Sequence, residues 1–394
     1  MGKRTFIGVL ALAVGLSLGF AASPIRVGVT VSATGPAASL GIPEKNTFLM
    51  IQEEINKAGG IGGHPVEFII LDDGTDPTTA VRNTRKLIEE DRVHAILGGT
   101  TSPISLAMID PVAEAQVPFI SLAAAKAIIS PVDEKRHWVF KVPQTDEIMA
   151  KAVVADMVAR GYQTVAYIGF NTAYGEGWAR EFAEEAQAAG LEIVADERYA
   201  PTDTSVTGQV LKILSRRPDA VLVGAAGTPA VLPQRTLVER GYRGQIYQTH
   251  GVANPDFLRV GGEFVENTLL PAGPILVADQ LGAEFPSKPV ALEYIVQYEG
   301  RYGIGSFSTF GGHAMDAWLI LKDALERTLD QVQPDDLAAF RSALRDAIEQ
   351  TRGLVATHGV FNYSSEDHLG LSFEDAAVIV RVKDGTWKLE RTFR

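Results

Sequence analysis

Six loop segments rich in glycine, alanine, serine and threonine carry the residues that could contact a small molecule. Each follows a short apolar run that is predicted to be a strand. Small residues let a ligand approach backbone N–H groups, and a helix that starts beside such a loop favours an anion. The segments are Ser32–Gly41, Gly98–Pro103, Leu122–Ala127, Asn171–Gly177, Gly224–Ala230 and Thr249–Asn254.

Ser102 and His250 are the one pair in these loops that could act as nucleophile and base. A hydrolase would also need a carboxylate to orient the histidine, and none is apparent near either residue. Ser102 precedes Pro103, so it also fits a helix N-cap with proline at the first helical position. Catalysis and capping are therefore two competing interpretations of Ser102.

Sequence patterns of other enzyme classes are absent. No Gly-x-Gly-x-x-Gly follows the first strand and no Gly-x-x-x-x-Gly-Lys-Ser/Thr occurs, so neither a dinucleotide nor a nucleotide triphosphate has its phosphate cradle. The sequence has no cysteine and its seven histidines are scattered, without the spacing of metal ligands on a helix. We expect no cofactor and no metal.

The loops are positioned by strands and helices that alternate from Pro24 to about Asn267. Near-continuous apolar strands, each followed by a helix, are typical of a parallel sheet covered on both faces. In such sheets ligands bind outside the carboxyl ends of the strands. The first unit is predicted to contain strands Ile25–Val31, Val66–Leu71, Ala95–Leu97 and Phe119–Ser121 and helices Asn46–Ala58 and Pro77–Asp91.

The same alternation then starts again, which predicts two similar lobes. His137–Gln144 and Leu269–Leu276 are interpreted as connections between them, and the chain ends in a hairpin of Ala377–Val382 and Thr386–Arg391. The other elements predicted are helices Ile148–Arg160, Tyr174–Ala189, Val206–Leu214, Pro289–Tyr302, Gly312–Leu329 and Pro334–Glu349, and strands Val165–Phe170, Ile193–Tyr199, Ala220–Val223 and Ile246–Gln248.

The N-terminus indicates an exported protein, and the net charge bears on its partners. The 394 residues include 48 acidic and 36 basic ones, a net charge of −12, so nucleic acid is not an expected partner. Lys3 and Arg4 precede an apolar run to Phe20 and the small residues Ala21 and Ala22. This arrangement predicts a signal peptide over residues 1–21.

Several short motifs, taken together and in order, carry a family resemblance. They are Thr34-Gly35-Pro36 with Gly41, Leu71-Asp72-Asp73, Pro111-Val112-Ala113-Glu114 with Val117-Pro118, Ile120-Ser121-Leu122-Ala123 and Tyr174-Gly175-Glu176-Gly177. The chain resembles the periplasmic solute-binding proteins of the leucine/isoleucine/valine-binding family, which serve ABC importers. The resemblance implies an α/β fold of two Rossmann-like lobes with mostly parallel sheets, joined by three crossover segments. Lobe 1 is expected to comprise residues 24–144 and 271–365, and lobe 2 residues 145–270 and 366–394.

The resemblance also implies how a ligand is held. In that family a serine after the third strand and an Ala-Ala-Thr stretch after the fourth bind the ligand's carboxylate; Ser102 and Ala123 match, but Ala125 stands where the threonine would be. A tyrosine and a glutamate of the second lobe fall on Gly227 and His250. The expected binding residues are Leu40, Thr101, Ser102, Ala123, Ala124, Ala125, Tyr174, Gly227, Thr228, His250 and Phe310.

The missing glutamate bears on the ligand, because in the family that residue neutralises an α-ammonium group. A buried ammonium without an anionic partner costs several kcal/mol. We therefore expect a small carboxylate without an α-amino group, such as a 2-oxo acid or an aromatic acid. The alternative is a branched-chain or other aliphatic amino acid, its amine held by a different acidic residue, or an amide.

The expected role is delivery of this solute to an ABC permease of the inner membrane. A periplasmic sensor that presents ligand to a receptor and a secreted hydrolase are the two other candidates. The absence of cysteine excludes a lipid anchor on that residue, so we expect a monomer that diffuses freely in the periplasm.

Overall fold

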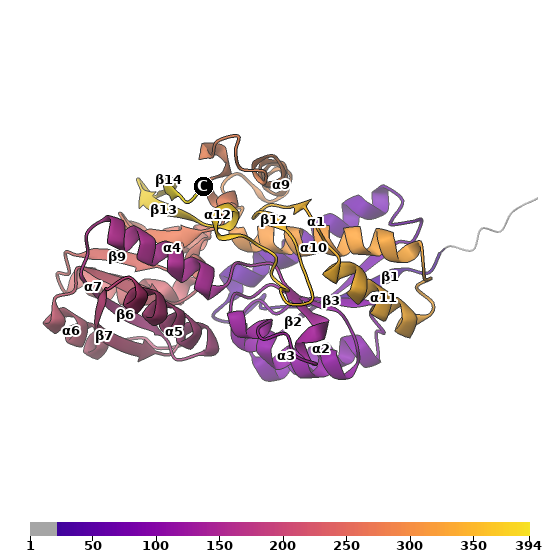
Figure 1. The fold of residues 1–394 in the computed structure, drawn as a ribbon, viewed down its shortest axis with the longest axis horizontal. Coiled ribbons are helices and arrows are strands. Elements are labelled where there is room, and N and C mark those ends of the chain that lie inside the picture. The colour runs from indigo at the N-terminus through magenta and orange to yellow at the C-terminus, as the bar shows by residue number, and fades with distance from the viewer. Residues whose placement is uncertain (1–21) are drawn as a thin grey trace, which may run out of the picture.

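A computed structural model describes residues 22–394, and the predicted signal peptide, residues 1–21, lies outside the described residues. Figure 1 shows two lobes side by side along the long axis, each built around one sheet. No helix among residues 22–394 combines the length and the apolar character needed to cross a membrane.

The first lobe is built on a five-stranded parallel sheet in the order β2-β1-β3-β4-β5. Its second strand, β1, carries Val27, Val29 and Val31, all fully buried, because helices cover both faces. The strands are β1 (Ile25–Val31), β2 (Val66–Asp72), β3 (Ala95–Gly98), β4 (Phe119–Ser121) and β5 (Val139–Lys141); the helices between them are α1 (Ala38–Lys57), α2 (Pro77–Glu89) and α3 (Ser102–Glu114).

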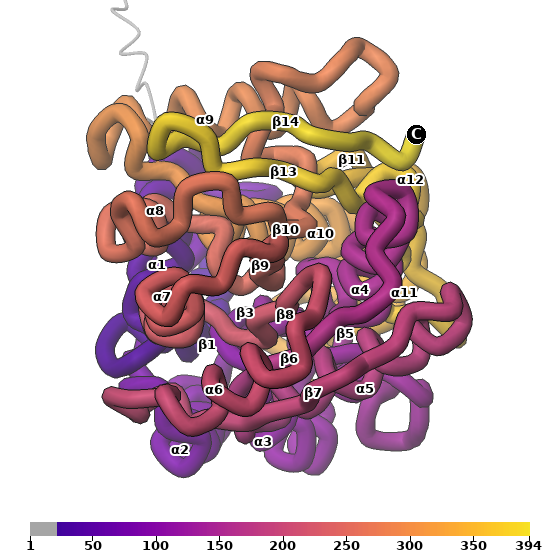
Figure 2. Tube along the Cα trace, turned by 90° about the vertical axis from the view of Figure 1, so that its left-hand side faces the viewer, coloured from indigo at the N-terminus to yellow at the C-terminus, as the bar shows by residue number. Residues whose placement is uncertain are grey.

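The second lobe is built on a seven-stranded sheet in the order β14-β13-β10-β9-β8-β6-β7, whose strands follow one another from top to bottom in Figure 2. β6 to β10 are parallel, and β13 and β14 join antiparallel. The strands are β6 (Thr164–Phe170), β7 (Glu192–Tyr199), β8 (Ala220–Gly224), β9 (Gln245–Gln248), β10 (Leu269–Ala272), β13 (Val378–Lys383) and β14 (Thr386–Thr392); the helices are α4 (Asp146–Ala159), α5 (Ala173–Ala188), α6 (Thr207–Arg216), α7 (Val231–Glu239) and α8 (Pro255–Gly261).

The chain crosses between the sheets three times: after β5, after β10 and before β13. Gln144 Nε2 donates to the carbonyl oxygen of Ala376 at 2.8 Å, which ties the first crossing to the third. Between the last two crossings the chain returns to the first lobe through α9 (Lys288–Tyr302), α10 (Thr309–Leu329), α11 (Leu337–Glu349), β11 (Leu354–Val355) and β12 (Val360–Phe361); α12 (Phe373–Ala376) precedes β13.

Two predicted connections contain strands that sequence reasoning missed. β5 lies within His137–Gln144 and pairs with β4, and β10 lies within Leu269–Leu276 and pairs with β9 and β13. Each strand is only three or four residues long, and a proline, Pro143 or Pro274, follows two residues after its end. A strand that short has no periodicity of its own, so only its pairing partners reveal it.

The predicted helix Asn46–Ala58 begins eight residues earlier than expected, at Ala38. Pro43 lies inside it, and an internal proline usually ends a helix because it lacks the N–H donor. Close packing at the helix start explains the difference: a Cβ on Gly41 would lie 2.2 Å from the carbonyl oxygen of Ser32. Glycine therefore lets the first turn of α1 rest on the end of β1.

The C-terminal hairpin is confirmed as predicted. β13 and β14 pair from Val378 with Thr392 to Lys383 with Thr386. Asp384 and Gly385 between them have φ of 53° and 65°, the left-handed conformation that a two-residue turn of this kind requires.

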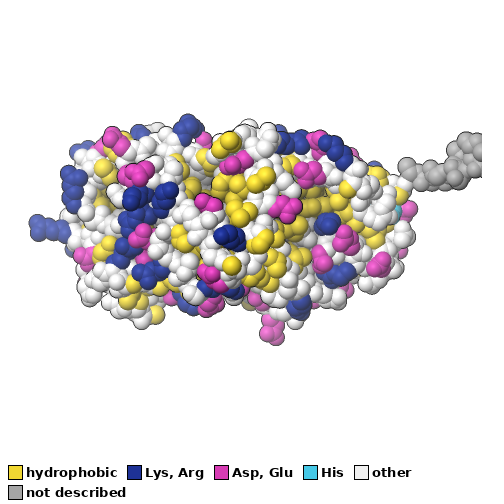
Figure 3. All heavy atoms as spheres, turned by 90° about the horizontal axis from the view of Figure 1, so that it is seen from above, with side chains coloured by type: hydrophobic (Ala, Val, Ile, Leu, Met, Phe, Trp, Pro, Cys, Tyr) yellow, Lys and Arg dark blue, Asp and Glu magenta, His cyan; other side chains and the backbone are white. Residues whose placement is uncertain are grey.

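On the face seen in Figure 3, acidic and basic side chains are interspersed and apolar groups gather near the middle of the long axis.

Candidate functional site

A cavity of about 300 Å³ lies where the carboxyl ends of the strands of both sheets meet. Segments that follow β1, β2, β3 and β4 form its wall in the first lobe, and segments that follow β6, β7, β8 and β9 form its wall in the second. The start of α10 and the first crossing complete it. The lining residues are Pro36, Ala37, Leu40, Thr75, Pro77, Thr100, Thr101, Ser102, Pro103, Leu122, Ala123, Ala124, Pro143, Phe170, Thr172, Tyr174, Pro201, Thr202, Ala226, Pro229, His250, Gly251, Phe310 and His313.

The structure brings most of the predicted binding residues together in this cavity. Its lining includes Leu40, Thr101, Ser102, Ala123, Ala124, Tyr174, His250 and Phe310. This clustering follows from the parallel topology, since the carboxyl ends of all strands in a parallel sheet meet at one edge.

Three predicted residues lie outside the lining. Ala125 instead donates its N–H to Ser102 Oγ at 3.2 Å. Gly227 donates its N–H to the carbonyl oxygen of Gly251 at 2.9 Å, and Thr228 begins a short 3₁₀ turn. Ala125 and Gly227 therefore support groups that do line the cavity.

Sequence reasoning also missed several lining residues. Phe170 is the last residue of β6 and Pro201 follows β7; the rule that ligands bind beyond strand ends could have identified both. His313 lies on the first turns of α10, and nothing in its neighbourhood in the sequence distinguishes it from a core residue. Only the tertiary packing of α10 places it against the cavity.

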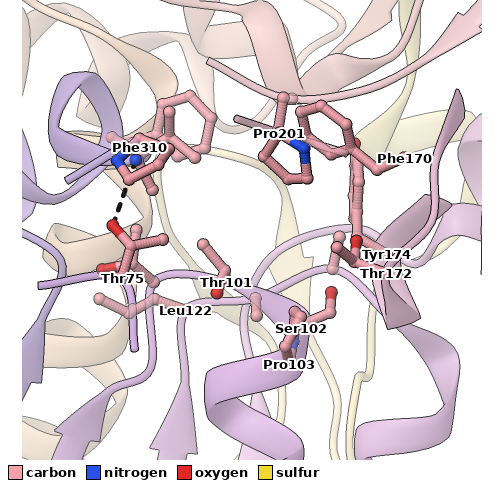
Figure 4. A pocket seen from close by; sticks show the side chains of 18 of the residues that line it. Thr75, Thr101, Ser102, Pro103, Leu122, Phe170, Thr172, Tyr174, Pro201 and Phe310 are labelled. Atoms are coloured by element: carbon pink, nitrogen blue, oxygen red, sulfur yellow. Dashed lines mark hydrogen bonds between the residues drawn. The ribbon is translucent and has the colours of Figure 1, made fainter. Parts of the chain in front are cut away.

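The N-terminus of α3 forms the end of the cavity best suited to an anion. In Figure 4 this helix starts at Ser102 and Pro103, at the lower side of the cavity. Thr101, not Ser102, is the N-cap, and it makes no side-chain capping bond, so the capping interpretation of Ser102 is wrong. Because Ser102 Oγ accepts the N–H of Ala125, its hydroxyl proton remains available. Helix dipole, free first-turn N–H groups and this hydroxyl together favour a carboxylate.

The walls beside this end are apolar and aromatic. Figure 4 shows Phe170, Tyr174 and Pro201 on one side and Leu122 and Phe310 on the other. Tyr174 is held by a hydrogen bond from its hydroxyl to Thr249 Oγ1 at 2.9 Å. Burial raises the pKa of Tyr174 above its usual value, so the tyrosine stays neutral and presents an aromatic ring.

No Asp, Glu, Lys or Arg lines the cavity within residues 22–394. Glu44 is buried behind Thr100, which donates to its Oε2 at 2.5 Å. Asp146 is also buried and accepts the N–H of Lys126 at 3.0 Å. Burial raises the pKa of both carboxyl groups, which disfavours the charged form that an ammonium group would need.

Two histidines contribute ring nitrogens to the polar groups near the lining, beside the hydroxyl groups of its threonines. His250 lies beside the rings of Tyr174 and Trp178, with ring centroids 6.3 and 5.7 Å away. Burial, with contributions from Lys141 and His358, lowers the pKa of His250 to about 3. His313 stacks on His358 with centroids 4.1 Å apart, and burial lowers its pKa well below the usual value. Both rings are therefore neutral at pH 7.

Comparison with known proteins assigns this architecture to a family. The family model described as periplasmic binding protein matches residues 24–386. The chain belongs to this family. The two-lobed fold predicted from the sequence is therefore confirmed, and the cavity lies between the lobes.

Relatives of this periplasmic binding protein span from about two thirds to nearly all of its length. A protein of Brucella melitensis named Leu/Ile/Val-binding protein homolog 3 is 25% identical, over 94% of this chain and 97% of its own. A leucine-, isoleucine-, valine-, threonine- and alanine-binding protein of Pseudomonas aeruginosa is 27% identical over 66% of this chain and 69% of its own.

Solved structures agree with this assignment. An extracellular ligand-binding receptor from Rhodopseudomonas palustris is 40% identical, covers 93% of this chain and 100% of its own, and superposes with a TM-score of 0.87. The substrate-binding protein LivJ of Streptococcus pneumoniae, solved with isoleucine, is 20% identical over 93% of this chain and 99% of its own, with a TM-score of 0.79. This second likeness supports the fold alone.

Proposed function

We propose that this periplasmic binding protein takes up a small carboxylic acid without an α-amino group, either a 2-oxo acid or an aromatic acid, and delivers it to an ABC permease. The observation that carries the proposal is the lining: a helix N-terminus with Ser102 at one end, apolar and aromatic walls, and no carboxylate side chain. The names of the relatives support transport of the branched-chain amino acid type.

The free-energy cost of burying an α-ammonium group favours an acid that lacks the amine. An α-ammonium group in this cavity would lose its water and gain no anionic partner, a loss of about 3–5 kcal/mol by comparison with broken buried ion pairs. Such a loss corresponds to an affinity at least about 100-fold weaker. The carboxylate, by contrast, meets N–H groups, a hydroxyl and the positive end of the α3 dipole.

In this proposal the two lobes contact different parts of the ligand. Lobe 1, residues 24–144 and 271–365, supplies the carboxylate-binding end, and lobe 2, residues 145–270 and 366–394, closes over it with Phe170, Tyr174 and His250. Contacts to both lobes stabilise the closed arrangement. A permease that recognises this arrangement would receive only loaded protein.

A hydrolase using Ser102 and His250 is less well supported. Both residues line the cavity, but the oxygen of Ser102 accepts the N–H of Ala125, and neither ring nitrogen of His250 makes a hydrogen bond within the described chain. A base with a pKa of about 3 is also too weak to activate a hydroxyl. We therefore propose binding without chemistry.

Calorimetry with matched pairs tests the proposal. L-Leucine is compared with 4-methyl-2-oxopentanoate, and L-phenylalanine with 3-phenylpropanoate, so that each pair differs at the α-position. We expect heat of binding from members that lack the amine and none from the corresponding primary amides, which lack the anion. Tight leucine binding without a response to either amine-free acid would overturn the proposal.

A further inference from the structure

The cavity holds a second group of polar atoms, separate from the N-terminus of α3. They belong to His250, which follows β9 in the second lobe, and to His313, on α10 in the first. The two residues are only 5% and 3% exposed. All four ring nitrogens are buried without a hydrogen-bond partner in the described part of the chain. Two unpartnered rings on opposite lobes face one apolar cavity.

Neighbouring residues fix both rings and leave their nitrogens free. His250 is held between the rings of Tyr174 and Trp178. His313 stacks on His358, and His358 Nδ1 hydrogen-bonds with Asp316 Oδ2 at 2.8 Å. Asp316 also accepts the N–H of Thr357 at 2.7 Å. The support reaches His313 through ring stacking only, so it uses none of the hydrogen-bonding capacity of His313.

The charge state of the rings restricts what they can bind. Burial and the proximity of Lys141 disfavour a proton on either ring. A neutral imidazole has one N–H donor and one acceptor nitrogen. A carboxylate only accepts hydrogen bonds and would leave the acceptor nitrogens unpaired. An ammonium only donates them and would leave the N–H donors unpaired. A hydroxyl group both donates and accepts, and it carries no charge into the apolar cavity.

We propose that His250 and His313 bind a hydroxyl group of the ligand, so that the solute is a hydroxylated carboxylic acid. This inference rests on the proposed function and deepens it. The carboxylate lies at the N-terminus of α3, and the hydroxyl lies at the histidine pair. One hydroxyl can pair with a nitrogen of each ring, whereas a ligand without it leaves both rings unpaired. A site built to bind a hydroxyl discriminates against analogues that lack it.

Calorimetry with hydroxylated and parent acids tests the inference. Benzoate and 3-phenylpropanoate are each compared with their three ring-hydroxylated isomers. We expect at least one isomer to bind about tenfold or more tightly than its parent acid, the lower end of the effect of one satisfied buried group. In His313→Phe the preference should fall to about twofold or less, while the parent acid still binds.

Controls separate this inference from the proposed function. His137→Leu changes an exposed histidine that lies outside the cavity, and it should keep the full preference for the hydroxylated acid. His250→Leu, on the other lobe, should repeat the loss and covers the case in which His313→Phe does not fold. If parent and hydroxylated acids bind equally to the wild type, or both histidine variants keep the preference, this inference is wrong and the proposed function stands. If no acid binds and L-leucine does, the proposed function itself fails.

Discussion

Ser102 is the side chain on which recognition of the carboxylate should depend most. Its hydroxyl oxygen accepts the N–H of Ala125, which leaves the hydroxyl proton available to a ligand at the start of α3. Ser105, one turn later on the same helix, is equally buried but bonds the carbonyl oxygen of Gly99 at 2.7 Å. The same helix therefore offers a binding serine and a structural serine.

Ser102→Ala should weaken binding of a carboxylic acid about tenfold, since one hydrogen bond to a charged group contributes about 1.5–3 kcal/mol and water recovers part of it. Calorimetry with 3-phenylpropanoate measures the loss. Ser105→Ala is the matched control: it should lower the unfolding temperature and leave the affinity within about twofold. Equal affinities of the two variants would contradict the role given to Ser102.

Buried His250 should make folding stability depend on pH. In the folded protein its pKa is about 3, against 6.5 ordinarily. As the pH falls below about 6.5, the His250 imidazole binds a proton in the unfolded chain but stays neutral in the folded protein. The free energy of unfolding therefore falls. The slope is at most about 1.4 kcal/mol per pH unit for this group, and the effect is absent above about pH 7.

Urea unfolding at pH 7.0 and pH 5.5 measures this dependence in the wild type and in His250→Gln. The variant should lose less stability between the two pH values than the wild type does. Identical losses would show that His250 does not remain neutral when the protein folds.

At the scale of single residues, the sequence predicted the lining residues that directly follow strands. It missed His313, which only tertiary packing brings to the cavity. Ser102, Tyr174 and His250 are small, polar or aromatic groups just beyond apolar runs, so the topology brings them together. His313 is a helix residue whose exposure to the cavity depends on how α10 packs against the crossings. Thr228 follows a strand like the others, but its turn directs it away from the lining.

At the scale of elements, the loop after β8 approaches the start of α1 across the cavity. A Cβ on Gly227 would lie 3.1 Å from Leu40 Cδ1 and 3.2 Å from Ser39 Oγ. Gly227 has a φ of +64° and a ψ of −161°, a conformation that is essentially confined to glycine and costs other residues about 1–3 kcal/mol. Gly241 has a φ of +82° and no atom within 4 Å of such a Cβ.

Gly227→Ala should therefore weaken ligand binding more than Gly241→Ala does. Both variants force alanine into a positive φ, and a thermal unfolding scan records that cost for each, but only Gly227→Ala places a methyl group against Leu40 and Ser39 of the other lobe. We expect about a tenfold or larger difference in affinity, from roughly 1–3 kcal/mol of overpacking. Two variants of equal affinity would show that these loops do not need to meet when ligand binds.

Elements marked by a long apolar run or by characteristic turn residues could be predicted from the sequence. Short strands that form only because they pair with neighbouring strands could not. The apolar strand Ile25–Val31 and the hairpin turn at Asp384 and Gly385 were expected and are confirmed. β5 and β10 are short strands next to crossings, so their neighbours in the sheet decide their structure. The start of α1 depends on Gly41 lying against Ser32, a contact across two elements that no local pattern records.

At the scale of the whole molecule, three crossings connect the two lobes, and we expect the lobes to move about them. Gln144 on the first crossing bonds Ala376 on the third. Thr309 Oγ1 of α10 donates to the carbonyl oxygen of Ala253 at 3.2 Å, a contact between the lobes. These contacts are those expected of a hinge and of a closed cleft.

A bound acid should compact and stabilise the protein. Small-angle scattering of the free protein and of the protein saturated with 3-phenylpropanoate measures the change, and a smaller radius of gyration is expected with ligand. The unfolding temperature should rise with ligand concentration, because the ligand binds only the folded protein. An unchanged radius together with saturable binding would rule out lobe closure.

The central claim is that the cavity selects acids that lack an α-amino group, and a direct competition tests it. The protein is incubated with equal concentrations of L-leucine, L-phenylalanine, 4-methyl-2-oxopentanoate and 3-phenylpropanoate, separated rapidly from free ligand and denatured. Mass spectrometry then identifies what it retained. We predict that the retained molecules are the amine-free acids; retention of either amino acid in their place would contradict the claim.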